Sequence, residues 1–270
     1  MENHFFKDIN GNIYHSLDDI PKGAVFDRLD LSFMDFTELP EILAFLRVRK
    51  LRINNCTALE TLKNLPRGLE WLDCSNTRIN TLKGIPEGVK HLNCRYTEIS
   101  TLKGCPRSVT HLNCSNTRIE TLKGSPEGLK YLDCSNTFIN TLADCPEGVK
   151  NLKCRNCNID TLKGCPEGVI SLDCSNTRIK TLEGCPEGMQ YLDCSGSHIN
   201  TLEGCPKDIK EIRCYDTKIK YIPTYIPDNA IQGLTREEIA ACKLNWVAEK
   251  QKEVLKGKSS DIASDFIHTY

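Results

Sequence analysis

The sequence predicts a solenoid whose concave face is a parallel β-sheet and whose convex side is extended, polyproline-like backbone. A unit of 20 residues recurs almost without interruption from Leu69 to about Ile222. A fixed period of this length is typical of repeat proteins in which each unit contacts only its neighbours. Such a unit is too short to hold a strand and a full helix, so extended backbone is expected on the return path.

One unit shows how the repeat is expected to fold. Leu72 and Cys74 are two residues apart, so both point into the core from a short strand. Thr77 follows where the chain leaves the strand, and its side chain is expected to turn inward and bond the backbone of neighbouring rungs. Ile79 and Leu82 bury the return segment. These positions fit, with substitutions, the pattern Leu-x-x-Leu-x-Leu-x-x-Asn-x-Leu, so we expect a leucine-rich repeat solenoid.

A glycine marks the turn in most units and is expected to adopt a positive φ. Asn64 and Asp144 replace it in two units, and these residue types tolerate that region best outside glycine. A proline two residues later, as at Pro86, fixes the backbone before the next strand. The glycines are Gly84, Gly104, Gly124, Gly164, Gly184 and Gly204.

The 16 cysteines are explained by the repeat rather than by disulfide bonds. Adjacent rungs lie ~4.8 Å apart, whereas a disulfide needs Cβ atoms ~3.8 Å apart. We therefore expect free thiols that fill the core, which implies a reducing compartment. The thiols of one column also lie along a line, whereas a zinc site needs ligands that converge from several directions. We therefore expect neither a metal nor a cofactor. One column runs from Cys74 to Cys214 in steps of 20, and the other contains Cys105, Cys145, Cys165, Cys185 and Cys205.

The repeat divides the chain into segments. Residues 1–25 are expected to cap the first rung, with a hairpin turn at Asn10-Gly11. Residues 26–222 are expected to form ten rungs, of which those before residue 69 are longer. A linker over 223–234 would then lead to the C-terminal segment.

A capping helix is predicted over 235–257, followed by a tail over 258–270. Thr235 and Glu238 form a capping box at its start, and Gly257 is expected to end it. Ile239 and Trp246 share one face of this helix. The simplest interpretation is a lid over the last rung, which solenoids need for solubility, and the alternative is a partner-binding helix.

The units resemble the short leucine-rich repeats of bacterial type III secretion effectors of the YopM and IpaH kind. The segment Ile85-Pro86-x-x-Val89-x-x-Leu92-x-Cys94-x-x-Thr97-x-Ile99-x-x-Leu102 matches that family's unit position by position, with Cys for Val and Thr for Asn. The resemblance covers roughly residues 26 to 222. It implies a binding scaffold that is delivered into a host cell. It implies no ligase activity, because the ligase members carry a long C-terminal catalytic domain and about 45 residues follow the repeats here.

Charge and motifs exclude several other classes of function. A formal net charge of -1 provides no field for nucleic acid or membrane surfaces. No apolar run approaches the ~18 residues of a membrane span, and the first ten residues lack a secretory signal. Cys214 and Asp216 match the Cys-x-Asp of the ligases by chance, since Cys214 lies in the core column. His91 and His111 face outward on adjacent rungs but are too few for zinc. No catalytic residue and no enzyme are predicted.

The residues that break the repeat on the concave face indicate a partner site. The core columns are nearly constant, whereas the outward columns, including one that is mostly serine, vary in charge and aromatic character. Exposed aromatic residues and arginines are the types enriched at binding hot spots. The predicted partner-binding residues are Trp71, His91, Arg95, Tyr96, His111, Tyr131, Arg155, Tyr191 and Tyr215.

The predicted function is non-catalytic binding of a partner protein through the concave face. The predicted setting is a bacterial cytoplasm or, after secretion, a host cytoplasm. One alternative is a structural module of a bacterial or phage complex, in which an end of the solenoid mediates assembly. Another is a thiol-based sensor or metal binder, whose thiols would react in the native state. The sequence leaves the oligomeric state open.

Overall fold

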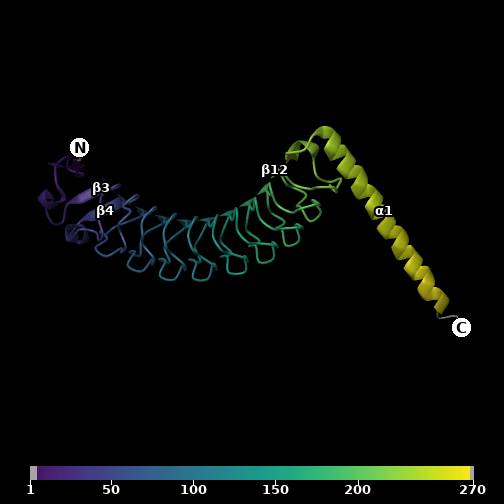
Figure 1. The fold of residues 1–270 in the computed structure, drawn as a ribbon, viewed down its shortest axis with the longest axis horizontal. Coiled ribbons are helices and arrows are strands. Elements are labelled where there is room, and N and C mark those ends of the chain that lie inside the picture. Colours follow the sequence, from purple (N-terminus) through teal and green to yellow (C-terminus); the bar gives the residue numbers. More distant parts are fainter. Residues whose placement is uncertain (1–4, 268–270) are drawn as a thin grey trace.

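The computed structural model describes residues 5–267 of the chain and forms a curved solenoid that is followed by a long helix (Figure 1). The strands of one 11-stranded parallel sheet follow each other in sequence order along the inner side of the curve. The predicted fold class is therefore confirmed. The strands are β3 (Val25–Asp30), β4 (Arg47–Arg52), β5 (Trp71–Asp73), β6 (His91–Asn93), β7 (His111–Asn113), β8 (Tyr131–Asp133), β9 (Asn151–Lys153), β10 (Ser171–Asp173), β11 (Tyr191–Asp193), β12 (Glu211–Arg213) and β13 (Ile231–Gln232).

Equivalent residues of adjacent units lie side by side, because the 20-residue period sets the register. Leu72 pairs with Leu92, and the next strand continues the same column. Leu72, Ile79 and Leu82 have no exposed surface, so each rung contributes the same side chains to one continuous core. The return segments of the 20-residue units contain turns and extended backbone. A 3-10 helix, η2 (Glu41–Phe45), occupies the return path of a longer, earlier unit.

The threonine column bonds within its own rung, which differs from the predicted link between rungs. Thr77 Oγ1 donates to the carbonyl oxygen of Cys74, at 2.8 Å, and Thr117 does the same to Cys114 at 2.7 Å. The cysteine thiols do bond between rungs, since Cys74 Sγ donates to the carbonyl oxygen of Asn93 at 3.4 Å, beside the backbone bond from Cys74 N to the same oxygen. The hydroxyl reaches back over three residues because the chain turns as it leaves the strand.

Positive φ angles recur in two columns of the repeat. The turn glycines have them as predicted, with φ of 99° at Gly84, and Asn64 takes their place with φ of 65°. Asp144 does not, so that part of the prediction is wrong. Its turn keeps the hydrogen bond from Cys145 N to Leu142 O, at 2.9 Å, without the left-handed conformation.

The second left-handed column directly precedes the threonine and was not predicted. Asparagine occupies it in most units, with φ of 56° at Asn76, and asparagine is among the residue types that tolerate this conformation. Tyr96 adopts the same φ of 56°, which is unusual for a bulky residue.

The N-terminal segment forms a small hairpin against the first rung. Strand β1 (Phe6–Lys7) pairs antiparallel with β2 (Ile13–Tyr14) around the predicted turn, where Gly11 has a φ of 88°. A 3-10 helix, η1 (Leu17–Asp19), follows. The Asp8 carboxylate accepts hydrogen bonds inside the turn. The bond from the Asn12 side chain contributes most to lowering the pKa of Asp8.

The predicted linker over 223–234 is structured, which corrects that prediction. It contains a 3-10 helix, η3 (Asp228–Ala230), and then β13, which adds an eleventh strand to the sheet. The sequence conceals this strand because it lies outside the 20-residue period.

The C-terminal helix α1 (Arg236–Ile267) extends away from the end of the solenoid (Figure 1). It does not end at Gly257, since a glycine inside a helix costs about 1 kcal/mol but does not break it. Its first turns pack on the last rung, where Ile239 and Cys242 are buried and Ile222 N donates to Cys242 O. Of the predicted tail, residues 258–267 are helical and residues 268–270 lie outside the described part of the chain.

Candidate protein-binding face

Four of the predicted binding residues lie side by side on the concave sheet. Trp71, His91, His111 and Tyr131 are the first residues of β5 to β8 and pair in register. They line a shallow hollow of about 290 Å³. The repeat places them together because each occupies the same outward position in consecutive units.

Three of these rings form a stack that continues along the solenoid. The His91 and His111 ring centroids are 4.4 Å apart with an interplanar angle of 26°, and the Tyr131 ring follows 6.2 Å from His111. A cation lies at each end of the row. The Arg52 guanidinium is 5.6 Å from the Trp71 ring centroid, and the Lys153 ammonium is 5.9 Å from the Tyr131 ring. We call these residues the cation-capped ladder: Arg52, Trp71, His91, His111, Tyr131 and Lys153.

The ladder is partly buried, and this burial changes the pKa of one of its histidines. Burial lowers the pKa of His91, and the neighbouring His111 and Lys90 lower it further. Both imidazoles are exposed enough to meet a partner. At neutral pH the ladder therefore presents a mostly uncharged His91 imidazole between two permanent cations.

Arg95 and Tyr96 lie outside the ladder, where the chain leaves strand β6. The guanidinium of Arg95 is 6.0 Å from the Tyr96 ring, and Tyr96 is 55% exposed. Tyr96 lines a separate depression with Asn116, Arg118 and Phe138. Phe138, at 58% exposure, was missed by the sequence argument because it lies on the return path rather than on the strand.

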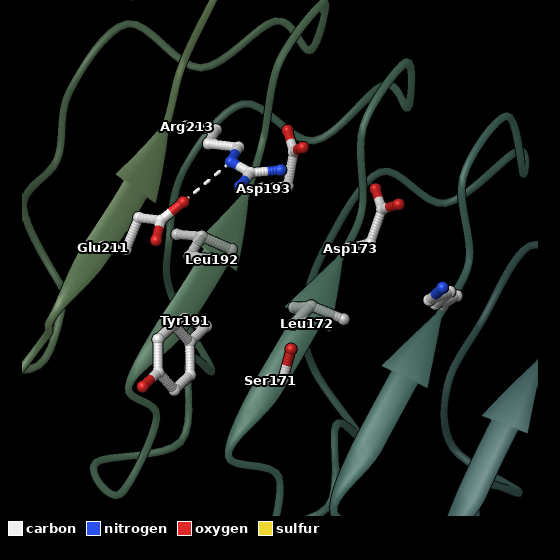
Figure 2. A pocket seen from close by; sticks show the side chains of 9 residues that line it. Ser171, Leu172, Asp173, Tyr191, Leu192, Asp193, Glu211 and Arg213 are labelled. Carbon is white, nitrogen blue, oxygen red and sulfur yellow. Dashed lines mark hydrogen bonds and ion pairs between the residues drawn. The ribbon is translucent and has the colours of Figure 1, made fainter. Parts of the chain in front are cut away.

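The other three predicted residues are dispersed toward the C-terminal end. Arg155 and Tyr215 are exposed at strand exits, and Tyr191 lines a second hollow of about 310 Å³ (Figure 2). Figure 2 shows Tyr191 beside Ser171, Asp173 and Asp193 further along the same two strands, and the ion pair of Glu211 and Arg213 at one side. The structure thus separates the predicted site into the ladder, the depression at Tyr96 and a second, more acidic hollow on the concave sheet.

The acidic column of the second hollow is more ordered than a solvated surface. Asp173 Oδ1 accepts hydrogen bonds from Ser175 N at 3.0 Å and from Ser175 Oγ at 2.6 Å. Asp73 and Ser75 form the same pair. The serine column, which we expected to face outward, is therefore buried at Ser75, Ser115, Ser135 and Ser175. The change from Asn93 and Asn113 to aspartate was the sequence signal for this difference between the two hollows.

All 16 cysteines are unpaired thiols, and most are buried. Burial raises the pKa of the column thiols, for Cys105 to about 12, so they carry almost no thiolate at neutral pH. Cys157 differs, because a hydrogen bond with the Cys134 thiol lowers the pKa of Cys157 to about 7. It is only 3% exposed, which keeps reagents away.

Residues 5–267 contain neither a cluster of metal-binding side chains nor a helix that could span a membrane. His, Cys, Asp and Glu side chains do not gather in threes at positions that would hold a metal ion. Over the same part of the chain, no helix has the length and apolar character that crossing a bilayer requires.

Comparison with known proteins supports the fold. YopM from Yersinia enterocolitica WA-314 is 26% identical, with a TM-score of 0.61, over 74% of this chain and 42% of that chain. YopM from Yersinia pestis is 20% identical, with a TM-score of 0.54, over 73% of this chain and 60% of that chain. The leucine-rich repeat domain of APL1B is 16% identical, with a TM-score of 0.60, over 78% of this chain and 74% of that domain.

The protein has the leucine-rich repeat fold. This fold is typical of protein-binding modules and is usually non-catalytic. The chain spans less than two thirds of either YopM structure. No protein-family model and no curated protein matches the sequence.

Proposed function

We propose that this protein is a non-catalytic scaffold that binds a partner protein through its concave face. The observation that carries the proposal is the ladder itself. Its aromatic residues interrupt columns that are otherwise small or polar, and they line one hollow on the inner side of the curve. Exposed aromatic side chains next to cations are the composition of interaction hot spots.

The proposed setting is a reducing cytoplasm, either of the bacterium or of a host cell after secretion. Sixteen unpaired thiols support a reducing compartment. Similarity to YopM, at 26% identity over 74% of the chain, supports a bacterial effector as the biological role.

Affinity capture from bacterial and host lysates tests the concave face. The wild type is compared with a Trp71→Ala/Tyr131→Ala double variant and with Phe138→Ala, which removes a more exposed aromatic ring from the return path. We expect one specific protein to be recovered by the wild type and by Phe138→Ala but not by the double variant. Equal recovery by all three proteins would reject the concave face.

A second candidate function is assembly through helix α1. Its outer face exposes Leu244 (72%), Val254 (57%) and Leu255 (67%), which no contact within the described residues covers. Apolar residues at such spacing on a protruding helix are typical of helix-mediated association. A Val254→Glu/Leu255→Glu variant in the same capture experiment would lose the partner if assembly is the function, and it would keep the partner if the concave face binds.

A further inference from the structure

The aromatic rings of the cation-capped ladder present their edges rather than their faces to a partner. His91 and His111 stack on each other at 4.4 Å, and Tyr131 continues the row at a 17° interplanar angle. Both faces of the His111 ring and one face each of the His91 and Tyr131 rings are therefore covered by neighbouring rings. The edges that remain exposed carry the imidazole nitrogens and the phenol hydroxyl, which can form hydrogen bonds with a partner. The Nδ1 of His111 already contacts the Thr110 hydroxyl, at 2.9 Å, which leaves Nε2 at the edge.

The charges around the ladder favour an anionic partner. Lys153 stands 5.9 Å from the Tyr131 ring and, like Arg95 and Arg155, makes no ion pair within residues 5–267. Arg52 Nη1 forms an ion pair with Asp30 Oδ2 at 3.6 Å.

The carboxylates beside the ladder are already engaged by the protein. Asp73 accepts hydrogen bonds from Ser75 and from Asn93 Nδ2, the latter at 3.1 Å, and Asp133 accepts one from Ser135 N, also at 3.1 Å. These hydrogen bonds leave both carboxylates charged. The ladder and the adjoining strand exits nevertheless carry the four cations Arg52, Arg95, Lys153 and Arg155 against the three carboxylates Asp30, Asp73 and Asp133.

We propose that the cation-capped ladder binds an extended acidic segment of a partner protein, with carboxylates directed at the two terminal cations and other polar groups of the segment directed at the ring edges. This inference rests on the proposed scaffold function and names the chemistry of its partner. Five rung steps separate Arg52 from Lys153, which is about 24 Å at the usual strand spacing. An extended peptide covers that distance with about seven residues at ~3.3 Å per residue.

The second hollow limits where the acidic segment can continue. Asp173, Asp193 and Glu211 follow the ladder on β10 to β12, and Arg213 is already paired with Glu211 at 2.7 Å. Further carboxylates would be repelled there, whereas a basic residue would be attracted. The acidic stretch of the partner therefore ends near Lys153.

Single-stranded nucleic acid fits this surface less well. Its recognition on protein surfaces relies on bases that stack on exposed aromatic faces, whereas the His91, His111 and Tyr131 rings already stack on one another. The acidic second hollow would also repel a phosphate backbone that extends beyond the ladder.

Fluorescence anisotropy with the full chain tests the inference at low and at physiological salt. The probes are a labelled peptide Asp-Glu-Leu-Glu-Tyr-Glu-Asp, a matched peptide with lysine at each acidic position, and a short oligodeoxythymidylate. Lys153→Glu reverses a charge in the ladder, and Lys103→Glu makes the same change at an exposed turn outside it. His111→Gln removes one ring while keeping polar atoms.

We expect saturable binding of the acidic peptide alone, weakened roughly ten-fold by Lys153→Glu and a few-fold by His111→Gln. Lys103→Glu should leave the affinity unchanged. Tighter binding of the oligonucleotide, equal binding of both peptides, equal effects of the two lysine variants, or no saturable binding would each overturn the inference.

A competition experiment separates this inference from the scaffold function. The acidic peptide should displace a partner that the concave face captures. If such a partner is lost in the Trp71→Ala/Tyr131→Ala variant but is not displaced by the peptide, the acidic-segment inference fails and the scaffold function stands. If the variant keeps the partner, the scaffold function itself fails.

Discussion

Replacing Thr117 by valine is expected to destabilise the solenoid although the two side chains have nearly the same shape. Thr117 is 4% exposed, and its hydroxyl donates to the carbonyl oxygen of Cys114 at 2.7 Å. In the described part of the chain no other donor reaches this oxygen. Valine keeps the β-branch, so the substitution leaves a buried acceptor without a partner. Such a loss costs about 1–3 kcal/mol.

Equilibrium urea unfolding, followed by circular dichroism, measures this cost. Thr117→Ser is the matched control, because it retains the hydroxyl that valine lacks. We expect the serine variant to lose less stability than the valine variant. If valine were as stable as the wild type, or if serine were the more damaging change, the hydroxyl bond would not hold the turn.

Three further predictions follow from other columns of the repeat. Gly164→Ala should lower the free energy of unfolding by about 1–2 kcal/mol or more in the same assay, because the φ of Gly164 is 84° and an added Cβ would lie 2.7 Å from the backbone of the preceding rung. Gly188→Ala is the control and should be nearly neutral, because a Cβ added there has no neighbour within 4 Å. The column thiols should react slowly with a disulfide reagent in the native protein and fully in denaturant, and a single fast thiol would instead favour the thiol-sensor alternative. Thr235→Ala should cost about 1 kcal/mol of helix stability by circular dichroism, since Thr235 Oγ1 accepts from Glu238 N. The reciprocal bond from Thr235 N lowers the pKa of Glu238 below the ordinary glutamate value of 4.5. The stability that this bond contributes is therefore present above pH 4.5 and is lost as the pH falls through the lowered pKa.

The period of the sequence was sufficient to predict the sheet, its register and the buried columns. Leu72 and Ile79 recur at positions that only a stacked rung can bury together, so the pattern leaves little freedom. The direction of the Thr77 hydrogen bond was not predictable in the same way. A hydroxyl can reach its own rung or the next, and the choice depends on backbone angles such as the φ of 56° at Asn76.

The ends of the solenoid were harder to predict than its middle. Strand β13 and the continuation of α1 past Gly257 lie outside the periodic region, where each segment is specified once rather than repeated. A glycine there indicates a helix end only statistically, because nothing in a repeat register confirms it. Only the structure shows that the helix continues past Gly257.

The candidate site shows the same limit for a different reason. The sequence placed Trp71, His91, His111 and Tyr131 in one outward column, and the structure stacks three of them. Its two cations belong to another column, since Arg52 and Lys153 align with Asp73 rather than with Trp71. The outward columns, taken one at a time, therefore do not predict a positive charge at each end of the row of rings.

This arrangement also explains how a nearly uniform repeat can carry a specific site. The inward columns hold the rung together, and a side chain such as His91 contributes little to that core because it faces outward. Outward positions can therefore differ from unit to unit at little cost in stability, as surface substitutions usually do. The concave face accumulates one side chain every rung, at a spacing of ~4.8 Å that is shorter than the distance between same-side residues of an extended peptide. A partner that lies along this face therefore meets the site as a continuous row, in which the sequence of charges, rather than any single pocket, decides which segment binds.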